Sequence, residues 1–451
     1  MVLRGVLLLN GVTVVSLLLT TQTHAYDWPE FRGPSGQGEA VESDPPVEWT
    51  PTKNVAWRTP IPGSGWSSPI VFGDRIYLTT AIQELDDTEL RQSPSVDFTD
   101  NTPTSRNTTD FNLSLRVLAV EKNYGHIVWE REVFSYAAGN YSPGHAKNGF
   151  ASPTPTTDGK TVYVHFGPQG TAALDWDGNA IWRRRVDYEA RHGAASSPVI
   201  AGNRLVLNCD GAEDPFVCAL DPRTGEELWR TQRQPMDFEK FAFSTPLAIP
   251  SSSTASSVQL VSPGSHMVGS YDPADGRELW HVYFPRRWSA VSRPVYANGM
   301  VIICNGGERN PELIAIRPDG SGDVSNSHVV WRHNKCVPLT SSVVVVDDHV
   351  YMVSDGGIAA CTEVGTGKLV WKKRLGGNFS ASPVCAGGRL YFPSDAGICH
   401  VIAAEREFRE LAKNDLGEPI LASFAVDGNA FIIRTGDALY RVEERDPRFA
   451  P

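Results

Sequence analysis

Three features are scarce or missing in this sequence of 451 residues, and each absence excludes a class of protein. The 41 lysines and arginines are outnumbered by 52 aspartates and glutamates. The resulting net charge of −11 argues against nucleic acid as a partner, because duplex binding needs a basic face. No cysteine stands in a CxxC or CxxCH pattern, so neither a structural zinc site nor an attached haem is expected. After residue 20, no apolar stretch is long enough to span a membrane.

The cysteines leave the disulfide pattern open. There are seven, so at least one thiol is unpaired within the chain. Cys209 and Cys218 flank a predicted loop and could form a disulfide bond, while buried free thiols are the alternative for most of the set. None lies in the first 30 residues, so lipid attachment to an N-terminal cysteine is not expected.

The N-terminus is typical of a secretory signal. Arg4 precedes an apolar stretch at residues 5–20, and the small residues of "THA" end just before Tyr26. We therefore predict a signal peptide over residues 1–25 and a soluble periplasmic or secreted protein. A retained membrane anchor is the alternative, although the stretch is short of the roughly 20 apolar residues that a span needs.

One decapeptide recurs along the chain. "LDPRTGEELW" at 220–229 has relatives that end in the same tryptophan, namely "YDPADGRELW" at 271–280, "TEVGTGKLVW" at 362–371, "VEKNYGHIVW" at 120–129 and "LDWDGNAIW" at 174–182. A fixed internal repeat indicates a repeat architecture, in which one supersecondary unit is copied and stacked.

Each repeat predicts four antiparallel strands. A Ser-x-Pro-like start leads into a short apolar strand, and a "GD", "GN", "DG" or "GG" turn reverses the chain, because glycine, asparagine and aspartate accept positive φ. An alternating strand, a third strand and the tryptophan strand follow. We count eight such units, which begin near residues 66, 151, 195, 243, 291, 340, 380 and 420.

This pattern predicts an all-β fold, an eight-bladed β-propeller of four-stranded antiparallel blades, over residues 54–445. A ring of packed blades buries both faces of every sheet, and a large tryptophan suits the space between neighbours. The last unit lacks a tryptophan strand, so we expect "NVAWRTPIP" at 54–62 to close the ring as the last strand of that blade. The seventh unit also lacks the tryptophan, and we expect Phe408 or Leu411 in its place.

Three segments lie outside the regular repeat. Residues 26–53 form an N-terminal extension, residues 446–451 form a tail, and residues 81–115 insert a long polar loop into the first blade. Loops of this length are usually either functional or disordered. The insertion is thus a lid, a partner contact or a disordered segment.

A basic and aromatic collar is predicted at one end of the channel. In this topology, the loops that join successive blades and the loops between second and third strands gather on one face. We predict that this face binds a partner or ligand through cation–π contacts, stacking and ion pairs. Ordinary loop packing and solvated charge are the alternative. The candidate residues are Trp66, Lys147, Arg191, His192, Lys240, Arg287, Trp288 and Phe379, with Arg286 and Phe241 beside them.

Repeats that end in "DPRTGEELW" resemble those of the pyrroloquinoline quinone (PQQ) type propeller superfamily. It includes quinoprotein alcohol dehydrogenases and BamB, a non-enzymatic lipoprotein of outer-membrane assembly. The stretch "YDWPEFRGPSGQG" at 26–38 is similar to the start of exported bacterial PQQ-like propellers. The resemblance covers nearly all of residues 28–445 and implies a fold rather than an activity.

Catalytic patterns are not found. The resembled dehydrogenases carry two adjacent cysteines and a calcium site, neither of which has a counterpart in this sequence, and no catalytic or metal-ligating residue is predicted. We therefore expect a non-catalytic, cofactor-free and monomeric scaffold that binds an envelope protein or a small ligand at the collar. The alternative is a PQQ-dependent dehydrogenase of alcohols or sugars, with PQQ and Ca²⁺ over the channel.

Overall fold

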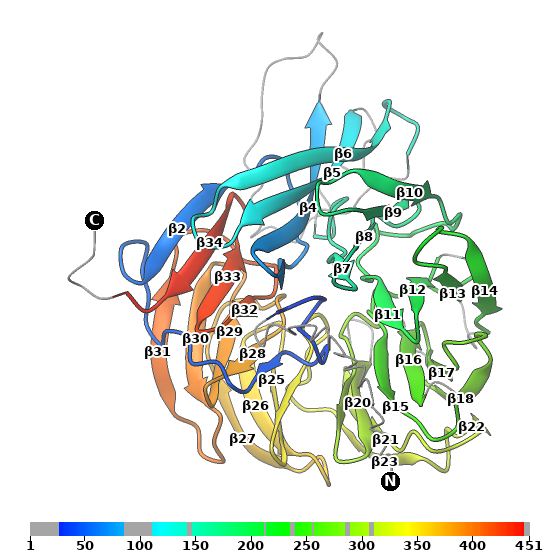
Figure 1. Cartoon of the computed structure of the whole chain (residues 1–451). Coiled ribbons are helices and arrows are strands. Elements are labelled where there is room, and N and C mark those ends of the chain that lie inside the picture. The colour runs from blue at the N-terminus through cyan, green and yellow to red at the C-terminus, as the bar shows by residue number, and fades with distance from the viewer. Residues whose placement is uncertain are drawn as a thin grey trace, which may run out of the picture.

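The chain folds into a ring of eight β-sheets around a central channel (Figure 1). The computed structural model describes residues 27–84, 111–141, 147–211, 213–234, 240–254, 257–284, 289–305 and 311–445. All the regular structure in these ranges is β, with 34 strands, which confirms the predicted eight-bladed propeller. Among the same residues, no helix has the length and apolarity needed to cross a bilayer. The predicted signal peptide (1–25), the tail (446–451) and most of the insertion (85–110) lie outside the described residues.

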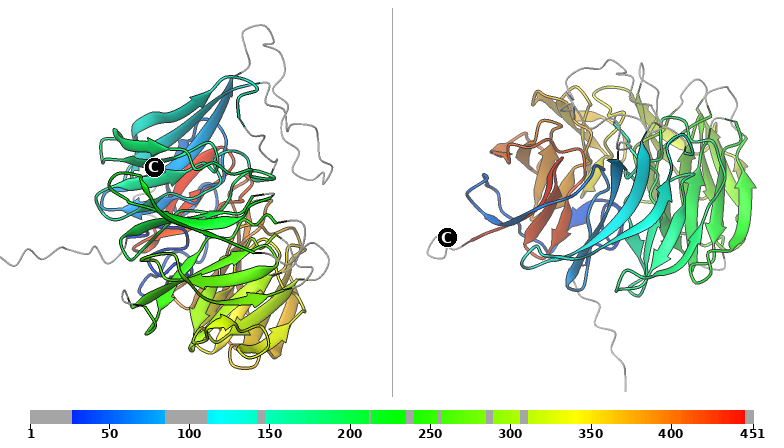
Figure 2. Two further views of the ribbon diagram at one scale, coloured as in Figure 1. Left: turned by 90° about the vertical axis from the view of Figure 1, so that its right-hand side faces the viewer. Right: turned by 90° about the horizontal axis from the view of Figure 1, so that it is seen from above.

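Each blade is an antiparallel meander whose first strand faces the channel and whose last strand lies at the rim (Figures 1 and 2). From channel to rim, the strands of blades 1 to 4 are β3 (Ile70–Phe72), β4 (Arg75–Glu84), β5 (Asn112–Glu121) and β6 (Ile127–Tyr136); β7 (Thr156–Thr157), β8 (Val162–His165), β9 (Thr171–Leu174) and β10 (Ala180–Arg184); β11 (Val199–Ala201), β12 (Arg204–Cys209), β13 (Phe216–Leu220) and β14 (Glu227–Gln232); and β15 (Leu247–Pro250), β16 (Val258–Gly264), β17 (Met267–Tyr271) and β18 (Glu278–Tyr283).

Blades 5 to 8 repeat the pattern, and the last of them ends on a strand from the start of the chain. Their strands are β19 (Val295–Ala297), β20 (Met300–Asn305), β21 (Glu312–Ile316) and β23 (Val329–His333); β24 (Val344–Val346), β25 (His349–Val353), β26 (Ile358–Glu363) and β27 (Leu369–Arg374); β28 (Val384–Ala386), β29 (Arg389–Pro393), β30 (Ile398–Ala403) and β31 (Glu410–Asp415); and β32 (Ala425–Asp427), β33 (Ala430–Arg434), β34 (Ala438–Glu443) and β2 (Val55–Pro60). Two short strands add parallel pairings, β22 (Gly322–Asp323) on β18 and β1 (Glu39–Ala40) on β28.

At most seams, the repeated tryptophan joins one blade to the next. Trp182 of blade 2 donates its indole N–H to the carbonyl of Pro222 in blade 3 at 2.8 Å. Its ring lies against Gly225, where an added Cβ would come within 2.6 Å of the indole. Gly225 also has a φ of +72°, which favours glycine. Within each copy of the repeat, the glycine therefore makes room for the tryptophan of the preceding blade, and the tryptophan packs against the following blade. The same pair occurs at four more seams, formed by Trp57 and Gly125, Trp129 and Gly178, Trp229 and Gly276, and Trp331 and Gly367.

Blade 7 fills the place of its missing tryptophan from elsewhere in the chain. Ala412 faces Val401 in β30, which is the register position that Trp371 holds opposite Cys361 in blade 6. The expectation that Phe408 or Leu411 takes the tryptophan position is therefore wrong. The ring that packs there is Trp49 of the N-terminal extension.

Trp49 reproduces the packing of a blade tryptophan. It stacks on Tyr391 of β29 with ring centroids 6.1 Å apart, the same distance that separates Trp371 from Tyr351. Its ring is 2% exposed, and its backbone N–H donates to the Asn414 side chain at 2.9 Å. An indole supplied by the extension thus fills the seam between blades 7 and 8.

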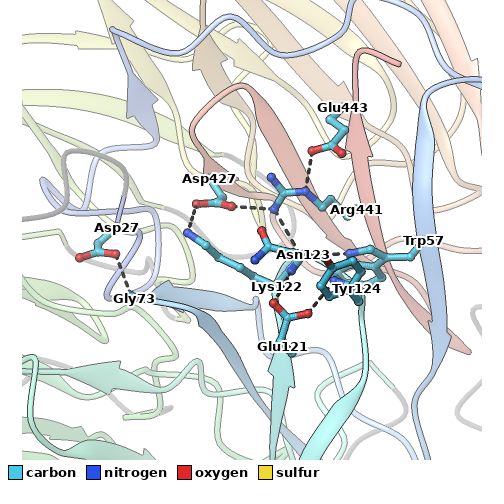
Figure 3. A network of polar contacts seen from close by, with 10 residues as sticks. All are labelled: Asp27, Trp57, Gly73, Glu121, Lys122, Asn123, Tyr124, Asp427, Arg441 and Glu443. Atoms are coloured by element: carbon cyan, nitrogen blue, oxygen red, sulfur yellow. Dashed lines mark hydrogen bonds and ion pairs between the residues drawn. The ribbon is translucent and has the colours of Figure 1, made fainter. Parts of the chain in front are cut away.

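The ring closes where the first blade strand meets the last. β2 pairs antiparallel with β34, from Val55 opposite Val442 to Pro60 opposite Ala438, which confirms the predicted closing strand. Figure 3 shows the polar contacts at the adjoining seam between blades 8 and 1. There the carboxylate of Asp427 accepts from Lys122 at 3.0 Å and from Arg441 at 2.6 Å. Ring closure is therefore fixed by backbone pairing and by buried charge together.

The N-terminal extension crosses one end of the channel before it reaches β2. In Figure 1 it is the dark blue segment that runs over the middle of the ring. Trp28 forms a β-bridge with Val71 of blade 1, and β1 then pairs with the channel strand of blade 7. We name residues 28–38 the plug and the face on which it lies the underside. The short turns within the blades belong to the same face, whereas the loops between blades form the opposite face, the mouth.

Candidate binding site at the channel mouth

A cavity of about 360 Å³ occupies the channel on the mouth side. Phe31 of the plug contributes to its lining and forms its floor, because the plug lies on the underside. The wall is formed by hydroxyl-bearing residues, with aromatic and basic residues nearer the mouth. The residues that line it are Phe31, Trp66, Ser68, Lys147, Asn148, Ser152, Thr154, His192, Ala195, Ser197, Phe241, Phe243, Thr245, Ser289, Val291, Thr340, Ser342, Ser380, Ser382, Leu421 and Ser423.

Seven of these residues form a ring of hydroxyl groups around the channel. Each stands at the middle position of the Ser-x-Pro-like start of a blade, and its hydroxyl oxygen accepts the backbone N–H of the equivalent residue in the preceding blade. The seven N···O distances lie between 2.9 and 3.1 Å. The repeated motif at the start of a blade therefore provides a hydrogen bond between adjacent blades. The ring consists of Ser68, Thr154, Ser197, Thr245, Ser342, Ser382 and Ser423.

The hydroxyl ring leaves hydrogen-bond donors on the cavity wall. Each hydroxyl oxygen accepts the N–H of the neighbouring blade through one of its lone pairs. The O–H of the same hydroxyl group can still be donated. Within the described part of the chain, none of the seven hydroxyls donates to a protein acceptor. The cavity can thus hold a group that carries hydrogen-bond acceptors.

Four of the predicted collar residues gather at the mouth. Trp66, Lys147 and His192 line the cavity together with Phe241. The His192 ring meets the Phe241 ring edge-on at 5.3 Å, and the Arg191 guanidinium lies 5.9 Å from the same ring. Lys147, Arg191 and His192 are exposed, whereas Phe241 is buried. The arrangement is a buried aromatic ring with exposed basic side chains beside it.

Two of the other predicted site residues, Lys240 and Phe379, do not join this cluster. Lys240 donates from Nζ to the carbonyl of Glu213 at 2.8 Å and does not line the cavity. Phe379 is 1% exposed and packs near His400, so the structure places it in the core, where a partner cannot reach it. Arg287 and Trp288, like Arg286, lie outside the described residues.

Two aspartates brace the mouth and were missed by the sequence analysis. Asp355 accepts hydrogen bonds from the backbone of Leu339 and Thr340 at 2.9 and 3.1 Å, and Asp395 accepts from the Ser380 hydroxyl at 3.0 Å. Burial raises the pKa of Asp395, while the nearby Lys147 charge lowers it. The sequence signal is the repeated "SDGG" at 354–357 and "SDAG" at 394–397. Each aspartate ties its strand connection to the loop that enters its own blade.

A buried arginine borders the mouth in blade 8. Arg434 donates from Nη1 to the carbonyls of Ser67 and Thr79, at 3.1 and 2.8 Å. Burial lowers its pKa to about 9. These contacts join blade 8 to blade 1 on the mouth side.

The described residues show no constellation for metal binding or thiol chemistry. No group of three or more histidine, cysteine, aspartate or glutamate side chains among them is placed to hold a metal ion. All seven cysteines are free thiols, so the possible bridge between Cys209 and Cys218 is not formed. Burial raises the pKa of the Cys209 thiol, which disfavours its reactive thiolate.

Comparison with known proteins identifies the family. A family model described as outer membrane protein assembly factor BamB matches residues 114–326 and 322–440. The BamB of Burkholderia pseudomallei (strain K96243) is 24% identical over 294 residues, which cover 62% of this chain and 70% of that protein.

Two solved structures share the fold. The BamB of Moraxella catarrhalis superposes with a TM-score of 0.52 at 12% identity and covers 73% of this chain and 93% of its own. A europium-containing methanol dehydrogenase superposes with a TM-score of 0.63 at 10% identity and covers 92% of this chain and 91% of its own. At such identities these likenesses show the fold alone. The sequence match spans more than half of the chain, and the protein therefore belongs to the BamB family of PQQ-like propellers.

Proposed function

We propose that this protein is an envelope scaffold that supports the assembly of outer-membrane proteins by binding a partner protein across the channel mouth. The match to the family of outer membrane protein assembly factors carries this proposal. Rigid rings with variable loops are suitable recognition surfaces, because the fold positions the loops and the loops determine what is bound. A periplasmic location follows from the same role.

The mouth has the chemistry of a protein interface. Binding energy at interfaces concentrates in aromatic and arginine side chains, and complementary charge directs the encounter. Arg191 and Lys147 are exposed cations beside Trp66 and Phe241, on a chain whose net charge is −11. We propose that the partner presents an acidic surface with one side chain or loop that enters the cavity. The hydroxyl ring then offers donors to acceptor groups of the inserted segment.

A complementation experiment tests the proposal. In the native host, deletion of the gene should lower the amounts of outer-membrane proteins, and the wild-type gene should restore them. The double variant Lys147→Ala/Arg191→Ala should fold normally but restore them poorly. The matched control is Lys160→Ala/Arg223→Ala, which removes two exposed cations from turns on the underside and should restore them fully. If both double variants restored the outer-membrane proteins equally well, the proposal that the partner binds at the mouth would be wrong.

A second measurement separates binding from redox chemistry. Purified protein is mixed with PQQ and Ca²⁺, and its absorbance spectrum, melting temperature and dye-linked alcohol oxidation are recorded. A scaffold should show no turnover, and the melting temperature should not move, because a ligand that binds the folded state would raise it. Turnover with a bound chromophore would instead support the dehydrogenase.

A further inference from the structure

We infer that the plug is a separable strap, held on the underside by Arg293, that makes the channel a blind pocket. The plug spans the channel between blades that lie far apart in the sequence. Its Trp28 pairs with Val71 of blade 1, the carbonyl of Pro29 accepts from Thr157 of blade 2, and the carbonyl of Gly38 accepts from Cys385 of blade 7. With this strap in place, a ligand or partner segment reaches the cavity from the mouth alone.

Arg293 is the exception in the hydroxyl ring. It stands at the middle position of the blade 5 start, where the other seven blades carry serine or threonine. Its backbone N–H donates to Ser342 as the repeat requires, but it offers no hydroxyl to Thr245 of blade 4. Blade 5 has therefore given up one interblade hydrogen bond.

The Arg293 side chain binds the plug instead. Its guanidinium is 1% exposed and forms an ion pair with Glu30 at 3.0 Å. It also donates to the carbonyls of Phe31 in the plug and Pro246 in blade 4. Two of its three partners belong to the plug, one of them the floor residue of the cavity. At the start of blade 5, an anchor for the plug thus replaces the ring hydroxyl.

The plug sequence is shaped to fit this contact. Arg32 reaches out of the plug and donates to the carbonyl of Val343 in blade 6 at 2.6 Å. Gly36 and Gly38 adopt positive φ, and an added Cβ would come within 2.6 Å of the Arg293 guanidinium and 2.7 Å of the Arg32 guanidinium, respectively. The second and third glycines of "RGPSGQG" are therefore needed for the close approach of the backbone to two arginines.

Holding the plug on the underside costs free energy, because Arg32 is strained and incompletely paired there. This cost allows the plug to dissociate while the ring stays folded. Arg32 is not glycine, yet its φ is +67°, and its Nε and Nη1 atoms are buried without a partner in the described part of the chain. Burial and the charge of Arg293 lower the pKa of Arg32 to about 9. Buried charge that is incompletely paired opposes the contacts that hold the plug. Local opening with a free energy below that of global unfolding is the expected result.

Hydrogen–deuterium exchange on the full chain tests the inference. The critical variant is Arg293→Ser, which restores the eighth ring hydroxyl while it removes the anchor of the plug. We expect the amides of residues 28–38 to exchange at least 10-fold faster in this variant, while those of β34 keep their wild-type rates. The matched control is Arg434→Ser, which removes an equally buried arginine that contacts no plug residue and should leave the relative protection of the plug unchanged.

Two outcomes would overturn the inference. If the plug keeps its wild-type protection in Arg293→Ser, the arginine does not hold it. If plug and β34 lose protection together, the plug is not separable from the ring. Should Arg293→Ser fail to fold, Glu30→Gln provides the second test, because it removes one charge of the ion pair with little change in shape. It should also accelerate exchange selectively in residues 28–38, and unchanged protection there would again contradict the proposal.

Discussion

The two ends of the channel are built in opposite ways. The underside is crossed by the plug, and it contains charge that is buried and paired at close range, as in the contact of Asp427 with Arg441. The mouth carries the connections between blades, with exposed Lys147, Arg191 and His192 around an open cavity. The charged groups on the underside hold blades 8 and 1 together, whereas those at the mouth are exposed to solvent. This difference suggests that the underside determines stability and the mouth determines recognition.

Two tryptophans give the largest test of this contrast. Trp49 is fully buried on the underside route of the extension, whereas Trp66 is half-buried at the mouth. Trp49→Ala should cost about 3–5 kcal/mol of unfolding free energy, because it opens a cavity between blades 7 and 8. Trp66→Ala should cost about 1–2 kcal/mol, because it removes less buried surface. Urea unfolding of both variants measures the difference. Equal losses would mean that the mouth is as structural as the underside.

Acid should lower the unfolding free energy through one residue near the mouth, His165. His165 ends β8, its Nδ1 lies 2.8 Å from the Thr171 hydroxyl, and burial lowers its pKa to about 4. The unfolded chain takes up this proton near pH 6.5, so it binds more protons than the folded chain between pH 6.5 and 4. This group should therefore contribute a stability that is present above pH 6.5 and falls by about 3 kcal/mol towards pH 4.

The variant His165→Gln isolates this contribution. It cannot bind the proton, so its unfolding free energy should fall less steeply between pH 6.5 and 4 than that of the wild type. Chemical unfolding at several pH values compares the two slopes. Parallel curves would show that His165 is not the acid-sensitive group at this end of the channel.

The features that recur from blade to blade could be predicted from the sequence, whereas features that occur only once in the chain were missed. The tryptophan–glycine seams, the eight blades and the closing strand all follow from spacing, because each copy of the pattern supports the others. Trp49 and Phe31 lie in a segment with no internal copy, so nothing in the sequence connects Trp49 with the gap at Ala412. Phe379 shows the opposite error, because an aromatic residue in a loop can face the core, and the direction of its side chain does not follow from its position.

The seam between blades 8 and 1 gives a charge-based test of the underside. Asp427→Asn keeps the shape of the side chain but leaves Lys122 and Arg441 without their shared carboxylate. Breaking a fully buried pair costs more, but these cations are partly solvated, so we expect a loss of about 2 kcal/mol. Thermal and urea unfolding provide the measurement, and a loss that stays the same in high salt would argue against a coulombic origin.

The matched carboxylate at the mouth should respond least. Asp395 binds Ser380, but burial raises its pKa, so its ionised form is less favourable in the folded chain than in the unfolded chain. The unfolded state thus binds fewer protons as the group titrates, and the wild type should gain stability from this residue as the pH falls. Asp395→Asn should remove that dependence and change the unfolding free energy at pH 7 by less than about 1 kcal/mol, since the amide oxygen can still accept from Ser380. A loss as large as that of Asp427→Asn would show that the charges of the mouth hold the ring together too, and the division of roles between the two ends would then fail.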